Sequence, residues 1–147
     1  MKQLFILSAI LLTLSVSAKA QQPIKLDYLV KVPTAYKDCG SLYTFDTTAL
    51  AKKKYVLVVD LQNTGMIMVD GKAVKLLMGE SKTVGKTNIV NYTGGGYTVV
   101  LSYATTNTKG KLDMESGTIE VTKGSSKLKI KMHGQTSCDE SKQEGNS

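Results

Sequence analysis

The chain has 147 residues and a formal net charge of +7, and all 19 of its basic residues are lysine. Lysine lacks the planar fork with which arginine grips phosphate groups in two places, so the composition argues against dedicated nucleic-acid or phosphate recognition. The length suits one modest hydrophobic core and leaves no room for two domains.

The first twenty residues have the three parts of a secretory signal peptide in order. Lys2 gives a basic tip, the run from Leu4 to Val16 is apolar, and Ala18-Lys19-Ala20 fits a cleavage site. The apolar run is shorter than the ~20 residues that a membrane-spanning helix needs. We therefore predict a cleaved signal peptide and a soluble exported protein, periplasmic or extracellular, with no integral membrane segment after cleavage.

The remaining chain is predicted to form a single β domain over residues 21–138, followed by a polar, disordered tail over residues 139–147. Loss of Lys2 and Lys19 with the signal peptide lowers the formal net charge from +7 to +5. In an exported protein an even pair of cysteines indicates a disulfide, here between the two cysteines near the ends of the domain, Cys39 and Cys138. Such a bridge places the first strands of the domain beside the last.

The first half of the domain alternates strands with one helical segment. Period-two alternation predicts a strand over Ile24 to Val32, and aromatic and β-branched residues favour another over Ser41 to Phe45. Asp46 to Lys54 is predicted to hold the one short helix, with Asp46 or Thr47 placed to cap its start and three lysines at the carboxyl end. Tyr55 to Leu61 is almost continuously apolar, which predicts a strand buried on both faces.

Turn signals divide the rest of the chain. Asp70-Gly71 between two apolar segments predicts a hairpin with a type I′ turn, which needs positive φ at both central residues. Glycines 94–96 are predicted to form a turn between short strands at Ile89 to Tyr92 and Tyr97 to Tyr103. Polar composition predicts loops over Gly79 to Asn88 and over Thr105 to Lys111.

The last hairpin shows strict alternation. Ile119 and Val121 share one face of the segment from Thr118 to Thr122, and the chain turns over residues 123–126. Beyond the turn, alternate residues are predicted to face inward and outward. The inward set is Leu128, Ile130 and Met132, and the outward set is Lys127, Lys129, Lys131 and His133.

About eight short strands with regular turn signals predict a small antiparallel β-barrel, lipocalin-like or similar, with one short helix; a β-sandwich is the alternative. The expected bridge between the first and last strands favours the barrel. The outward lysines Lys127, Lys129 and Lys131 make a possible basic surface for an anionic polymer or membrane, but a solubilising face, partly neutralised by Glu120 across the hairpin, is the simpler interpretation.

No set of residues indicates catalysis. Gly85-Lys86-Thr87 resembles the end of a phosphate-binding loop, but the spacing to Gly79 is wrong and neither a parallel strand nor a helix is predicted beside it. His133 is the only histidine, and no nucleophile or general base stands out. Asp113 and Glu115 share a face, which we interpret as ordinary loop charge. We therefore expect no enzyme activity, no cofactor and no metal.

Two functions fit such a module. The first is a monomeric binding protein whose barrel interior or mouth holds a small apolar ligand or cell-envelope component, since eight strands leave space for one small molecule. Tyrosines are candidates to line the mouth. They are Tyr28, Tyr36, Tyr43, Tyr55, Tyr92, Tyr97 and Tyr103.

The second function is protein interaction, for example inhibition of a host or competitor enzyme. Several motifs occur in the same order as in a known family: an early cysteine, Tyr43-Thr44-Phe45, the hairpin from Val69 to Ala73, the loop from Ser81 to Gly85 and Gly96-Tyr97-Thr98. In this order of motifs the chain resembles the periplasmic inhibitors of C-type lysozyme. That resemblance covers residues 39–104 and implies an eight-stranded barrel that inserts a loop serine and a later lysine into the lysozyme cleft. Ser and Gly are farther apart here than in that family, and a positive inhibitor repels a basic enzyme.

Overall fold

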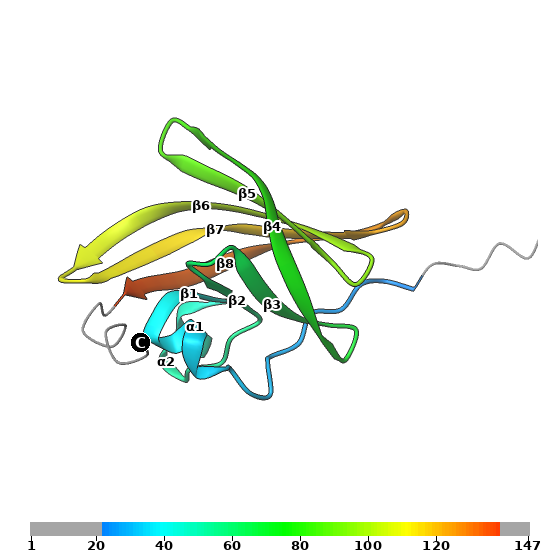
Figure 1. Ribbon diagram of the computed structural model, residues 1–147, viewed down its shortest axis with the longest axis horizontal. Coiled ribbons are helices and arrows are strands. Elements are labelled where there is room, and N and C mark those ends of the chain that lie inside the picture. The colour runs from blue at the N-terminus through cyan, green and yellow to red at the C-terminus, as the bar shows by residue number, and fades with distance from the viewer. Residues whose placement is uncertain (1–21, 139–147) are drawn as a thin grey trace, which may run out of the picture.

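The computed structural model describes residues 22–138, and these form a closed antiparallel barrel with two short helices. The elements in chain order are α1 (Thr34–Asp38), β1 (Cys39–Thr44), α2 (Thr47–Ala51), β2 (Leu57–Asp60), β3 (Thr64–Val69), β4 (Lys72–Val84), β5 (Thr87–Gly94), β6 (Tyr97–Lys109), β7 (Leu112–Lys123) and β8 (Ser126–Cys138). Each strand pairs with the next along the chain, and β1 pairs with β8 (Figure 1). The predicted eight-stranded barrel is confirmed, and the sandwich alternative is wrong.

The two ends of the chain carry predictions that the structure does not address. The predicted signal peptide and the predicted polar tail lie outside residues 22–138, which are the described part of the chain. Within that part, neither helix is long enough or apolar enough to cross a membrane.

The predicted disulfide between Cys39 and Cys138 is present and joins the first strand to the last across 99 residues of sequence. The two cysteines are the first residue of β1 and the last of β8, and the pairing continues from them to Thr44 opposite His133. The bridge therefore lies at the seam where the barrel closes.

The Asp70-Gly71 turn between β3 and β4 is confirmed as the hairpin expected from sequence. Both residues have positive φ, 50° and 73°, as a type I′ turn requires. The short helix is also confirmed, although it is shorter than predicted. Asp46 caps α2 by accepting a hydrogen bond from the backbone N–H of Ala49 at 2.7 Å.

Three predictions about local structure are wrong. The segments predicted as loops, Gly79 to Asn88 and Thr105 to Lys111, are mostly strand, because β4 and β5 run to a tight turn at residues 85–86 and β6 continues to Lys109. Their side chains are polar because this end of the sheet meets water, and exposed polar residues pair through their backbones as well as apolar ones do.

The segment from Ile24 to Val32 is not a barrel strand. Ile24, Leu26, Leu29 and Val32 are buried, whereas Tyr28 is 37% and Val30 93% exposed, and the one bridge from this segment to the sheet joins Leu26 to Val69. The barrel closes by pairing of β1 with β8, and this segment pairs with the sheet only at the end of β3, through hydrogen bonds from the Asp27 N–H to the Met68 oxygen and from the Asp70 N–H to the Lys25 oxygen. The predicted alternation holds at Ile24, Leu26 and Val32 but fails between them, where Leu29 is buried and Val30 is exposed.

Two apolar clusters hold the fold together. The inner cluster fills one half of the barrel and includes Leu57, Ile67, Leu101, Ile119 and Met132, each no more than 1% exposed. The outer cluster covers β1 to β3 beneath the helices and the N-terminal segment (Figure 1), and its members include Tyr36, Leu42, Leu50 and Val58. The prediction that the strand near residues 55–61 is buried on both faces is thus confirmed.

Candidate ligand-binding site

The inner face of the barrel changes from apolar to polar along its long strands. Alternate residues of a strand project to the same face, and residues paired across two antiparallel strands share that face. On β7 the inward positions, read toward the strand's start, are Val121, Ile119, Gly117 and Glu115. On β6 the residues paired with them are Val99, Leu101, Tyr103 and Thr105. The barrel therefore has one packed apolar half and one polar half.

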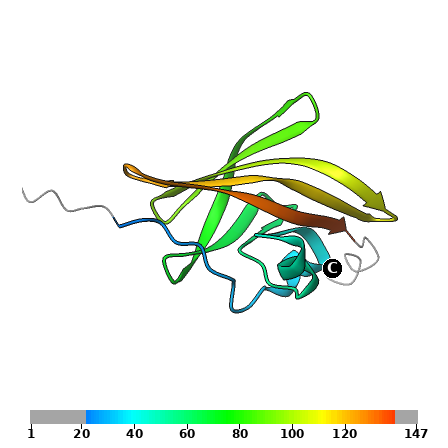
Figure 2. The ribbon, with the colours of Figure 1, turned by 180° about the vertical axis from the view of Figure 1, so that it is seen from behind.

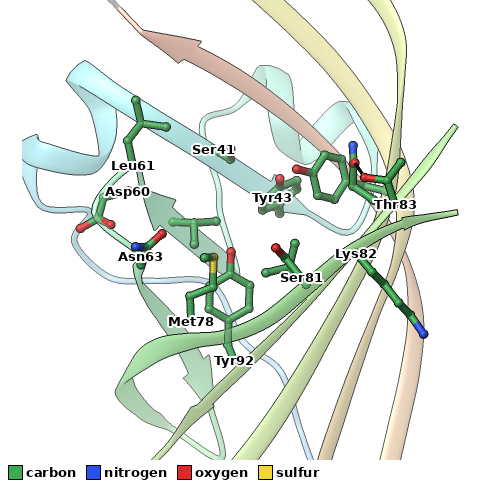
Figure 3. Close-up of a pocket in the computed structure, with 14 residues that line it drawn as sticks. Ser41, Tyr43, Asp60, Leu61, Asn63, Met78, Ser81, Lys82, Thr83 and Tyr92 are labelled. Atoms are coloured by element: carbon green, nitrogen blue, oxygen red, sulfur yellow. Dashed lines mark hydrogen bonds between the residues drawn. The ribbon is translucent and has the colours of Figure 1, made fainter.

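A cavity of about 480 Å³ opens in the polar half. Its wall combines three tyrosines with three apolar side chains, drawn together from five strands, and these residues are Tyr43, Val59, Met78, Val90, Tyr92 and Tyr103. Figure 3 shows Tyr43, Tyr92, Met78 and Ser81 turned toward one common space. Three of the seven tyrosines proposed from sequence thus line the mouth, and we call this space the tyrosine cavity.

The β2–β3 turn forms one rim of the tyrosine cavity, and Asp60 and Asn63 lie there together (Figure 3). The Asp60 carboxylate accepts hydrogen bonds from the backbone N–H groups of Gln62 at 2.9 Å and Thr64 at 2.8 Å. It also accepts one from the Thr64 hydroxyl. Asp60 is thus fixed in place by the turn, and its carboxylate oxygens bind groups of that turn at the rim of the cavity.

The β4–β5 hairpin forms the opposite rim. It contributes Ser81, Lys82, Thr83 and Asn88, and the Thr83 hydroxyl donates to the Asn88 side-chain oxygen at 2.9 Å. Pairing of β3 with β4 ends at Leu77, so the outer part of the hairpin has no neighbour on that side. Figures 1 and 2 show the hairpin standing away from β1, β2 and β3. The cavity lies between this hairpin and the β2–β3 turn, since residues of both line it.

Glu115 lies behind the wall of the tyrosine cavity and is 6% exposed. The Thr136 hydroxyl donates a hydrogen bond to its Oε1 at 2.8 Å, and the Ser41 and Thr136 hydroxyl oxygens are 2.6 Å apart. A hydroxyl has one proton to donate, so Thr136 accepts its bond from Ser41. The Oε2 atom of Glu115 has no hydrogen-bond partner among the described residues.

Burial shifts the ionisation of these side chains. It raises the pKa of the Glu115 carboxyl, while the nearby Tyr43 hydroxyl and the hydrogen bond from Thr136 lower it and the charge of Asp113 raises it further. Burial is likewise the main cause of the raised pKa values of Tyr43, Tyr92 and Tyr103. The three phenols therefore stay protonated at neutral pH, and Tyr92 and Tyr103 donate no hydrogen bond to another described residue.

The ring of Tyr43 rests directly on Gly134 across the β1–β8 seam. A Cβ atom at Gly134 would lie 2.2 Å from Cδ1 and 2.6 Å from Cε1 of Tyr43, which is closer than side chains approach. Tyr43 is 1% exposed and therefore has little room to move away. The glycine is needed for Tyr43 to hold its place in the cavity wall.

The other residues singled out from sequence lie apart from the tyrosine cavity. Lys127, Lys129 and Lys131 are exposed on β8, and Lys127 forms an ion pair with Glu120 at 2.9 Å. His133 is half-buried opposite Thr44, on the face of β8 away from the cavity. Cys39 and Cys138 share the inward face with Ser41 and Thr136, at the end of the same seam.

Sequence reasoning missed Glu115, because the interpretation of Asp113 and Glu115 as loop charge is wrong. Both residues lie in β7, and Glu115 is buried. The available signal was a period-two pattern running through Glu115, Gly117, Ile119 and Val121. Gly85 and Lys86 form the turn of the β4–β5 hairpin, so the phosphate-loop interpretation also lacks the helix it requires.

Within residues 22–138, the histidine, cysteine and acidic side chains form no group of three that could hold a metal ion. The chain matches no protein-family model, and searches of curated proteins and of solved structures found no significant similarity.

Proposed function

We propose that the protein is an exported binding module that holds a small ligand in the tyrosine cavity. The observation that carries this proposal is the division of the barrel interior, which is packed in one half and hollow and polar in the other. A volume of about 480 Å³ lies within the range of small-molecule sites. A barrel built for stability alone would fill this half with apolar side chains.

The lining defines the shape of the ligand. The rings of Tyr43, Tyr92 and Tyr103 offer flat apolar surface, while Ser81 and Asn88 offer hydrogen-bonding groups at the rim. A ligand with a flat apolar body and a polar edge would satisfy both parts. The lining therefore supports a mixed ligand better than the wholly apolar one expected from sequence.

Binding fits the cavity better than catalysis does. The Ser41 hydroxyl is bonded to the Thr136 hydroxyl rather than to a base, so nothing activates it as a nucleophile. His133 lies on the opposite face of β8. The export part of the proposal rests on the signal-like residues 1–20 and on the disulfide, which persists in oxidising compartments.

The test is mass spectrometry of an extract of the purified protein, followed by thermal-shift measurements with the extracted compounds and with small aromatic probes. Ser81→Trp should block the cavity, because Ser81 lines it, and should abolish binding. Glu80→Trp is the matched control, since Glu80 is exposed on the same hairpin and does not line the cavity. An empty protein that no probe stabilises would refute the proposal.

A second function is favoured by the β4–β5 hairpin, which projects beyond its neighbours and carries Ser81 and the 58% exposed Val84 (Figure 2). A projecting hairpin suits insertion into the cleft of another protein, as the resemblance to lysozyme inhibitors implies. An assay of C-type lysozyme at low salt tests this function. Inhibition at micromolar protein that Val84→Asp abolishes would support it, and no inhibition would end it.

A further inference from the structure

Resting on the proposed function, we infer that the tyrosine cavity takes a small organic cation, namely a protonated amine carried on a flat apolar body. The charged groups around the cavity point to this chemistry. Asp60 lines it and Glu115 lies behind its wall, where Thr136 and Tyr43 contact the carboxyl group. Two acidic side chains therefore lie at or near the cavity although the whole chain is positive.

Lys82 does not cancel this negative field. It belongs to the exposed β4–β5 hairpin, and its side chain extends away from the space that Tyr43, Tyr92 and Ser81 enclose (Figure 3). An ammonium group on a flexible exposed stem is well solvated and screened, whereas Glu115 acts from within the protein, where screening is weak. An anionic ligand would thus meet buried negative charge without a buried cation to offset it.

The tyrosine rings add to the preference for a cation. The face of an aromatic ring is negative, and a cation above it is attracted more strongly when water is excluded. Tyr43 and Tyr92 are only 1% and 4% exposed, so a small part of each ring is accessible from the cavity, and Tyr43 lies beside Tyr103 with 6.0 Å between ring centroids. Tyr103 is half-buried and offers the larger ring surface to a ligand.

The buried carboxyl group of Glu115 is the feature that favours a cationic ligand over a neutral one. Its Oε1 is satisfied by Thr136, but its Oε2 is buried without a partner among the described residues. A buried acceptor without a partner is unfavourable, and a buried carboxylate more so. A nearby ammonium group would stabilise the ionised carboxylate, while an alcohol of the same shape would bring no charge.

The experiment compares three probes of one shape: phenethylamine, 2-phenylethanol and 3-phenylpropionate. Their affinities for the whole secreted chain are measured by calorimetry at pH 7, for wild type, Glu115→Gln and Ser81→Trp. We expect the amine to bind wild type about tenfold more tightly than the alcohol, as a buried charge and aromatic faces would produce. Glu115→Gln should remove most of that difference, and Ser81→Trp should abolish binding of all three.

The pH dependence provides a second measurement. The titratable groups that act on Glu115 are Tyr43 on β1, Tyr103 on β6 and Asp113 on its own strand, and the two phenols stay neutral below pH 8. Amine affinity should therefore rise with pH as Glu115 ionises and level off once it is fully ionised, at a pH above the ordinary glutamate range. In Glu115→Gln the affinity should be nearly independent of pH.

The outcomes separate the two proposals. Equal or tighter binding of the alcohol or the acid would overturn the cation inference and leave the binding function intact. An amine preference that persists in Glu115→Gln would also overturn the role given to Glu115. If no probe binds and the extracted protein is empty, both proposals fail together.

Discussion

Replacing Gly134 with alanine tests whether the cavity wall is as tightly built as the structure indicates. The new Cβ would lie 2.2 Å from the Tyr43 ring, more than 1 Å closer than ordinary van der Waals contact, and 3.2 Å from the backbone oxygen of Leu42. Overpacking of this kind costs about 1 to 3 kcal/mol of unfolding free energy. With a urea m-value of about 2 kcal/mol per molar, the unfolding midpoint should fall by roughly 0.5 to 1.5 M.

Gly79→Ala is the control for Gly134→Ala, because Gly79 is also a strand glycine but its Cβ would meet only the Asn91 backbone oxygen at an ordinary 3.6 Å. Urea unfolding followed by circular dichroism should show little change for this variant. Adding Tyr43→Leu to Gly134→Ala should restore part of the loss, since it shortens the side chain that the methyl group meets. Equal midpoints for the two alanine variants would refute the proposed contact.

Three further predictions concern stability. Replacing Cys39 and Cys138 together by serine should lower the unfolding free energy by about 4 to 5 kcal/mol in the chain-entropy model, because the bridge spans 99 residues; urea titration with and without the bridge measures this. Asp46→Ala should cost about 1 kcal/mol by the same assay, because it removes the hydrogen bond to the Ala49 N–H. Burial raises the pKa of the folded-state Glu115 carboxyl, so the folded protein retains a proton that the unfolded chain releases. Stability should therefore fall as pH rises from the ordinary glutamate value through the folded value, and Glu115→Gln should remove this fall; an unchanged pH profile would contradict it.

Most of the fold was predictable because local patterns and turn chemistry agree with the closed sheet. Asp70-Gly71 predicts its hairpin turn because these two residue types tolerate the positive φ that the turn requires. Leu57, Val58 and Val59 are consecutive apolar residues, which indicates a strand buried on both faces. The segment from Ile24 to Val32 shows the limit of such patterns. Its alternation runs through Tyr28 and Val30, which are exposed, and past Leu29, which is buried, so the pattern predicted neither the strand pairing nor the burial of its middle part correctly.

The candidate site was harder to predict because its residues become neighbours only through register. Ser41 and Thr136 are 95 residues apart in sequence, and their contact follows from the pairing of β1 with β8. Polar composition suggested loops at Thr105 and Glu115, since sequence alone does not reveal that one half of a barrel is hollow. The sequence allowed tyrosines to be named as candidate lining residues. It did not show which of them line the cavity and which pack elsewhere in the protein.

Barrel closure and formation of the cavity wall are the same event in this protein. Three alternate inward pairs of residues join β1 to β8. Cys39 and Cys138 form the disulfide, the hydroxyl groups of Ser41 and Thr136 form a hydrogen bond, and the ring of Tyr43 rests on Gly134. This pairing joins the most distant strands of the barrel, so it carries the greatest loop-closure cost and is expected to form late in folding. A ligand that contacts Tyr43 therefore stabilises the seam itself, and its affinity depends on the seam being closed.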